Sequence, residues 1–78
     1  MLGAAADRLF ERLRAWRAAT AREHGVPAYV IFHDATLREI ALQAPATTDA
    51  LAGISGVGAR KLESYGAAIL ELVAGAAD

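Results

Sequence analysis

The residues whose types and spacing could do chemistry are concentrated in the stretch LAGISGVGARKLESYG, residues 51–66. Gly56 and Gly58 flank a valine, and two cations, Arg60 and Lys61, follow closely. Glycines let backbone N–H groups approach a phosphate, and the N-terminus of a following helix adds a favourable partial positive charge. The stretch therefore predicts a helix-hairpin-helix-like corner that binds an anion, with both cations one turn inside the helix.

The same residues also have a purely structural interpretation. Gly56 and Gly58 would then supply positive φ angles and tight packing where one helix follows another, and Arg60 and Lys61 would be ordinary solvated side chains. From the residues alone the two interpretations are about equally supported.

No other part of the chain carries a catalytic or metal-binding pattern. His24 and His33 lack a third ligand at a suitable spacing, and neither Ser55 nor Ser64 lies on a nucleophile-elbow turn. The chain has no cysteine, which excludes disulfides and thiolate metal sites. It also has no GxxxxGK[ST] loop, the phosphate-binding motif of many ATPases. We therefore expect a domain that is not an enzyme and has no metal or cofactor of its own.

Length and hydropathy limit the chain to one small unit. With 78 residues, 55% of them hydrophobic, we expect a single domain over residues 1–78, with its core within about 7–74, excised from a longer protein. No segment approaches the roughly 18 apolar residues that cross a bilayer, so we expect a cytoplasmic protein without a membrane partner. We also expect it to be monomeric in isolation.

The charge is weak overall and unevenly distributed. The formal net charge is −1, whereas a dedicated nucleic-acid binder usually has a clear positive excess. Residues 7–24 carry five arginines against three acids, but residues 34–49 carry one arginine against three acids. The acidic middle segment gives an alternative hypothesis, a surface that docks on another protein, although such residues can also form a solvated face. These residues are Asp34, Glu39 and Asp49, joined by Glu63.

Apolar spacing predicts a first helix over residues 7–24. Its apolar stripe is Leu9, Phe10, Leu13, Trp16 and Ala19 or Thr20. Gly25 and Pro27 end this helix, because glycine accepts the left-handed conformation at a helix end and proline cannot continue a helix.

The following residues 28–32, AYVIF, have strand propensity but no partner strand in the sequence. We interpret them as a helical or extended connector that buries Val30, Ile31 or Phe32. Asp34 would cap the next helix, which Pro45 stops. The inner stripe of that helix is Leu37, Ile40, Ala41 and Ala44.

Two more helices complete the predicted fold. Thr47 or Thr48 can cap a short helix ending near Gly53, and a last helix runs from about residue 58 to 74. Gly66 lies on the buried stripe of the last helix, which suggests close packing there. The prediction is an all-α, compact orthogonal bundle of four to five helices.

In this order the motifs resemble the HRDC domain, the helicase and RNase D C-terminal module, over residues 7 to about 74. The form is most similar to that of bacterial RecQ-type DNA helicases. The resemblance rests on Val26-Pro27, Tyr29-Val30, Phe32, Asp34-Ala35-Thr36-Leu37, Pro45, Gly56-Val57-Gly58, Lys61 and Tyr65-Gly66.

The resemblance implies an accessory, non-catalytic module that modulates DNA-structure-specific binding by its parent, a nucleoid-associated bacterial helicase that would use ATP and Mg elsewhere. An RNase D-like parent is the alternative. Weak contact with single-stranded or branched DNA would involve Tyr29 and the hairpin set Gly56, Gly58, Arg60 and Lys61, and other domains of the same chain would be further partners. Tyr29 could instead be half buried, with only its hydroxyl in water.

Overall fold

Five helices account for most of the chain in the computed structural model, which describes residues 3–76. No strand occurs in that range, so the predicted all-α fold is confirmed. The helices are α1 (Ala4–His24), α2 (Ala28–Ile31), α3 (Asp34–Gln43), α4 (Thr48–Ala52) and α5 (Ala59–Ala76).

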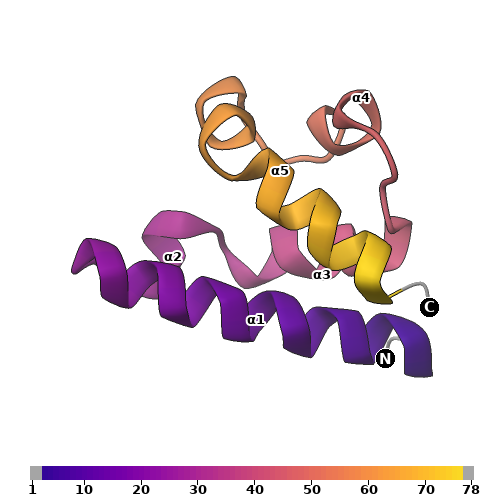
Figure 1. Cartoon of the computed structure of the whole chain (residues 1–78), viewed down its shortest axis with the longest axis horizontal. Helices are drawn as coiled ribbons and strands as arrows, with labels where there is room; N and C mark the ends of the chain where they lie inside the picture. The colour runs from indigo at the N-terminus through magenta and orange to yellow at the C-terminus, as the bar shows by residue number, and fades with distance from the viewer. Residues whose placement is uncertain (1–2, 77–78) are drawn as a thin grey trace.

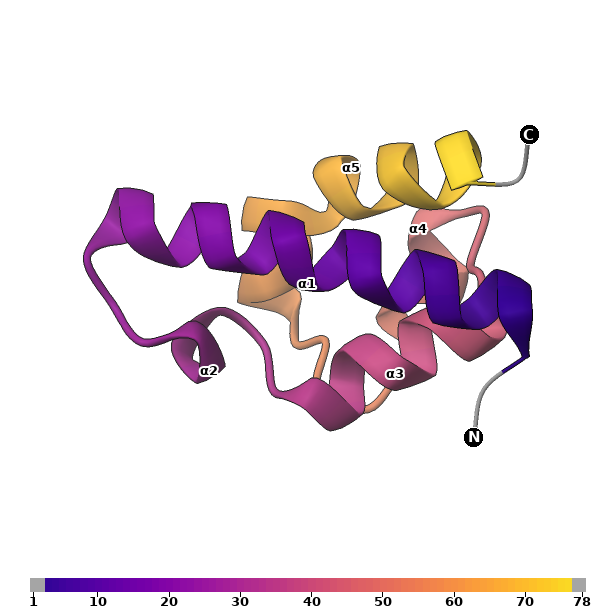
Figure 2. The same cartoon turned by 90° about the horizontal axis from the view of Figure 1, so that it is seen from below.

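The long helix α1 runs along the whole length of the molecule (Figure 1). Helices α3 and α5 both contact α1, and the view from below shows them on opposite sides of it (Figure 2). Helix α4 packs on α5, away from α1. The start of α1 and the end of α5 lie at one end of the molecule, and α2 lies toward the other end (Figures 1 and 2).

A single apolar cluster lies between these helices and holds them together. Six large side chains in it are almost completely inaccessible to solvent, and their burial supplies about 1.5–3 kcal/mol each. They are Leu13, Phe32, Leu37, Ile40, Leu51 and Ile69. They come from α1, α3, α4, α5 and the segment after α2. Displacing any of these elements would therefore expose apolar surface to water.

Helix α1 begins three residues earlier than predicted, at Ala4, and ends where predicted. Gly25 has φ 64°, and its N–H donates to the carbonyl of Arg22 (3.2 Å), which is the predicted glycine end. The predicted stripe was wrong at its last position, because Ala19 is exposed and Thr20 only half-buried, whereas Arg17 is buried. Arg17 occupies the stripe because its guanidinium binds the segment after α2.

The helix ends farther along the chain agree only in part with the predictions. Asp34 is not the cap of α3: His33 is the N-cap, and Asp34 is the first helical residue. Ala44 was also wrongly placed, since it lies exposed beyond α3 with φ 44°. The predicted Thr47 cap is confirmed by a 3.1 Å hydrogen bond from the N–H of Ala50 to Thr47 Oγ1.

The segment AYVIF forms no strand, as predicted. Its first four residues are the short helix α2, and Phe32 is extended. Ile31 and Phe32 are buried, whereas Val30 is 46% exposed. The two buried side chains therefore attach this segment to the core while its other face remains in solvent.

The glycine hairpin packs on the start of α3. Gly56 has φ 93°, and a Cβ atom at this position would overlap Thr36 Oγ1. Thr36 Oγ1 donates to the carbonyl of Ser55 (3.3 Å), which fixes the two segments together. Gly58 does not have the positive φ considered above, and space around it is open. Close packing thus requires glycine at position 56 and not at position 58.

We predict that Gly56→Ala destabilises the domain by about 1–3 kcal/mol, because Ala is strained at positive φ and must displace Thr36. Gly58→Ala is the matched control, with an expected change within about 0.5 kcal/mol. Urea unfolding followed by circular dichroism measures both. Equal changes for the two variants would contradict the packing role assigned to Gly56.

Candidate nucleic-acid interface

Arg17 fixes the backbone that carries the exposed residues of the connector. Its side chain, on α1, reaches past the core, and its Nη1 donates to the carbonyl oxygen of Phe32 (2.9 Å). The same nitrogen is 2.6 Å from Asp34 Oδ1. Arg17 is only 8% exposed, and a buried cation is stable only when it is paired. One guanidinium therefore holds the residues on both sides of His33.

The Asp34 carboxylate is stabilised in its charged form by this arrangement. The hydrogen bond from Arg17 and then the charge of Arg17 lower the pKa of Asp34 below its ordinary value of 3.8. The positive charges of Arg14 and Arg38 act in the same direction, and partial desolvation opposes them. Since the Asp34 side chain is 58% exposed, solvent screens the pair and limits its contribution to stability.

Tyr29 lies on the solvent-facing side of α2. It is 61% exposed, so the half-buried alternative considered for this ring is not what the structure shows. Its ring is nearly parallel to the exposed His33 ring, with an interplanar angle of 24° and 6.1 Å between centroids. Tyr29 thus remains largely exposed to solvent, although its ring lies beside that of His33.

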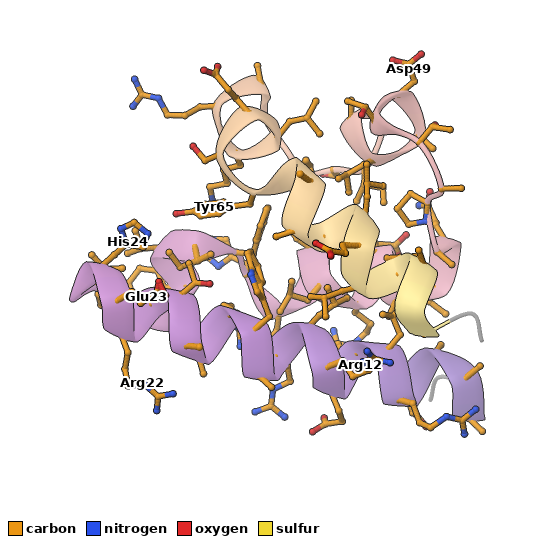
Figure 3. The ribbon with its side chains drawn as sticks, viewed as in Figure 1. Arg12, Arg22, Glu23, His24, Asp49 and Tyr65 are labelled. Carbon is orange, nitrogen blue, oxygen red and sulfur yellow. The ribbon has the colours of Figure 1, made fainter. Side chains whose placement is uncertain are left out.

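An aromatic cluster beneath the connector joins it to α1 and α5. The Phe32 ring lies 6.1 Å from Trp16 of α1 and 6.0 Å from Tyr65 of α5. Figure 3 shows Tyr65 directed from α5 toward the last turn of α1, near His24, and their ring centroids are 6.4 Å apart. The cluster sets the position of the first half of α5 relative to α2.

Of the two cations named from the sequence, Arg60 and Lys61, it is Lys61 that contacts the connector. Its Nζ lies 5.2 Å from the centroid of the Phe32 ring, within the range of a cation–π interaction. Phe32 is three residues after Tyr29, so the ammonium group lies at the base of the segment that carries the exposed ring. Arg60 is exposed in the first turn of α5, and no contact joins it to Tyr29 within the described residues.

The glycine hairpin approaches the same region from the side of α3. Gly56 and Gly58 are exposed, and Thr36, two residues into α3, holds the hairpin by the bond to Ser55 described above. Sequence reasoning missed both Thr36 and Arg17. The spacing of Leu9, Leu13, Arg17 and Ala21, every fourth residue, is the signal that could have revealed a buried arginine.

The acidic residues proposed for docking do not form one cluster. Asp34 is bound to Arg17, and Glu39 accepts a 3.0 Å hydrogen bond from Gln43. Asp49 projects from α4 at the edge of the molecule (Figure 3), and Glu63 lies exposed on α5. Their carboxylates are thus distributed over three helices.

Two other features are absent from the described residues. Among residues 3–76 no group of three or more His, Cys, Asp or Glu side chains is arranged to hold a metal ion. None of the helices between these residues combines the length and the apolar character needed to cross a bilayer.

Comparison with known proteins identifies the fold. The family model of the HRDC domain matches residues 6–73. The solved structure of D. radiodurans RecQ HRDC domain 3 superposes with a TM-score of 0.89 and 36% identity, covering 94% of this chain and 96% of that one. This five-helix chain is therefore an accessory domain of the all-α HRDC type. It belongs to the HRDC family, as the sequence motifs predicted.

Two helicases show where similar sequences occur. The ATP-dependent DNA helicase UvrD2 of Mycobacterium tuberculosis is 51% identical over 69 residues, which cover 88% of this chain and 10% of the helicase. The ATP-dependent DNA helicase RecQ of Bacillus subtilis is 46% identical over 65 residues, covering 83% and 11%. This chain thus spans about a tenth of the length of these relatives. It is a non-catalytic module of the kind found in such helicases.

We predict that Asp34→Asn removes a pH-dependent part of the stability. Because the folded pKa is lowered, the Arg17–Asp34 pair stabilises the fold above the unfolded pKa near 3.8 and loses this effect as pH falls through the still lower folded pKa. The variant should melt at a lower temperature than wild type at pH 6, and the two should converge toward pH 2. Thermal melts across this range measure the difference, and a constant difference would contradict the assigned pair.

Proposed function

We propose that this chain modulates which DNA structures a parent helicase binds, through weak contact with single-stranded DNA. The observation that carries the proposal is the 61% exposure of Tyr29 on a connector that the core and Arg17 hold in place. An exposed aromatic ring on a rigid support offers a stacking surface to an unpaired base. Base–aromatic stacking contributes about 1–3 kcal/mol per base and tolerates any sequence.

The position of Lys61 supports the same proposal. Its ammonium group lies over Phe32, at the base of the Tyr29 segment, where it could meet the phosphate next to a stacked base. Arg60 and the first N–H groups of α5 follow the exposed hairpin of Gly56 and Gly58, and a helix start favours an anion. We therefore assign the strand a path from Tyr29 past Lys61 toward the hairpin.

The charge of the domain limits the affinity. Binding to nucleic acid strengthens with the number of phosphates that cations neutralise, and this chain has eight Lys and Arg residues against nine Asp and Glu. Glu11 already binds Arg14, and Asp34 binds Arg17. Weak binding suits a module that adjusts the choice of DNA structure while other parts of the parent supply most of the affinity.

The parent that we infer is an ATP-dependent DNA helicase of bacterial type, since relatives named UvrD2 and RecQ carry similar segments. ATP and Mg would then bind elsewhere in the parent, in the cytoplasm near the nucleoid. Residues 1–78 would be one monomeric module, with other domains of the same chain as further partners.

Docking of the acidic side chains on a protein surface stays a prediction with less structural support. Asp34 and Glu39 already bind side chains within the domain. Of the four acidic residues named for docking, this leaves Asp49 and Glu63. An effect of Asp49→Ala and Glu63→Ala on the parent enzyme, with no effect on DNA binding by this chain, would favour docking.

We predict that Tyr29→Ala weakens binding of a labelled single-stranded oligonucleotide by about 5- to 150-fold, the loss of one stacked base. Fluorescence anisotropy at low salt measures the change. Leu42→Ala is the matched control, because Leu42 is also a large apolar side chain, 52% exposed, at the far end of α3. The proposal fails if wild type shows no binding at low salt, or if both variants bind equally well.

Lys61→Ala should weaken binding in a way that depends on salt. The slope of log affinity against log salt concentration is negative, and losing one phosphate contact to a single strand makes it shallower by about 0.7, whereas Tyr29→Ala should leave the slope unchanged. Titrations at several salt concentrations separate the two effects. An unchanged slope in Lys61→Ala would remove this residue from the proposed interface.

A further inference from the structure

Tyr29 is not the only exposed ring in this region, because a second one directly follows the connector. His33, four residues later, is also exposed, and the two rings are tilted by only 24° with 6.1 Å between their centroids. Val30, between them in the sequence, is 46% exposed. The rings of Tyr29 and His33 and the apolar side chain of Val30 are thus all open to solvent, whereas Ile31 and Phe32 between them in the sequence are buried.

The carbonyl of His33 accepts hydrogen bonds from the N–H groups of Thr36 and Leu37, but no hydrogen bond or ion pair within the described residues involves its side chain. His33 is the N-cap residue of α3, but its side chain makes no capping hydrogen bond, and asparagine, aspartate or serine is preferred at such positions. Its neighbours explain its fixed position: Arg17 binds the carbonyl of Phe32 and the carboxylate of Asp34. The backbone of His33 is therefore held on both sides while its ring remains available.

The charges around His33 do not prevent a nucleic acid from approaching. The nearest carboxylate in the sequence, Asp34, is neutralised by Arg17 and lies within the field of Arg14 and Arg38. Lys61 lies over the ring of Phe32, the residue before His33. A backbone phosphate beside the two rings would therefore meet more positive than negative charge.

We propose that Tyr29 and His33 form a two-ring platform on which two bases of a single strand stack. This inference rests on the proposed function and extends it, because it assigns His33 as a second contact residue for the unpaired bases of the strand. Bases in a duplex already stack on one another and cannot cover two protein rings without being unpaired. The platform therefore favours single-stranded segments over duplex ones.

The geometry favours a platform over a single-base clamp. Successive bases of a strand stack about 3.4 Å apart, so a base between two rings needs a separation of about 6.8 Å. The 6.1 Å between the centroids of Tyr29 and His33 is shorter than that even if the rings face each other directly. Two bases on the outer surface fit the observed spacing without moving the connector.

The test compares His33→Asn with His33→Phe in binding to a labelled single-stranded oligonucleotide. Asparagine keeps a good helix cap but has no ring, so affinity should fall about fivefold or more, while the melting temperature stays near that of wild type. Phenylalanine restores a ring without charge, and affinity should return to within about twofold of wild type. His33→Lys supplies charge without a ring and should not restore binding.

Each outcome decides the inference. If His33→Asn binds like wild type while Tyr29→Ala binds weakly, His33 is not a contact and only the proposed function stands. If His33→Lys restores affinity and His33→Phe does not, His33 acts as a cation and the platform is wrong. If wild type binds no single strand at low salt, the platform and the proposed function both fail.

A spectroscopic readout distinguishes stacking from a structural effect. On addition of the oligonucleotide, the ring protons of both Tyr29 and His33 should shift upfield in NMR spectra, because a stacked base shields them. Shifts at Tyr29 alone would overturn the two-ring platform.

Discussion

The buried guanidinium of Arg17 is the interaction on which the arrangement of the exposed surface depends. A charge removed from water must be paired, and Arg17 has two partners, the carbonyl of Phe32 and the carboxylate of Asp34. Its Nε is buried without a hydrogen-bond partner among the described atoms, so the pairing carries a residual cost. Through Arg17, α1 fixes the conformation of the backbone from Phe32 to Asp34, where Phe32 is extended between two helices.

Phe32 connects this electrostatic constraint to the core. Its carbonyl binds Arg17, its ring contacts Trp16 and Tyr65, and Lys61 lies over the ring. One residue thus links α1, the connector and α5. Both the backbone and the side chain of Phe32 are engaged, so this core residue joins the segment that carries Tyr29 to α1 and α5.

Much of the fold could be predicted from the sequence, because local signals specify it. Gly25 and Thr47 act at helix ends through their own backbone or side chain, and the stripe of Leu9 and Leu13 reports the buried side of α1. The errors have tertiary causes. Asp34 was expected to cap a helix, but a long-range ion pair with Arg17 engages its carboxylate, and no local pattern reveals such a partner.

The residues proposed for the candidate site could be named from the sequence, but their arrangement in space could not. The resemblance to HRDC domains pointed to Tyr29 and Lys61, and the structure places Lys61 at the base of the Tyr29 segment. The proximity of Tyr29 to His33 depends on Phe32 being extended between two helices, which strand and helix propensities do not specify. Likewise, the need for glycine at position 56 depends on Thr36, twenty residues earlier.

The antiparallel course of α1 and α5 has a consequence for a longer polypeptide. Because α1 starts and α5 finishes at the same end of the molecule, while α2 lies toward the opposite end (Figure 1), flanking segments of a parent enzyme would leave from the end distant from Tyr29. Tethers attached there would permit the domain to pivot as a rigid arm. Under the proposed function, the exposed ring of Tyr29 would then reach DNA within a radius set by the tether length.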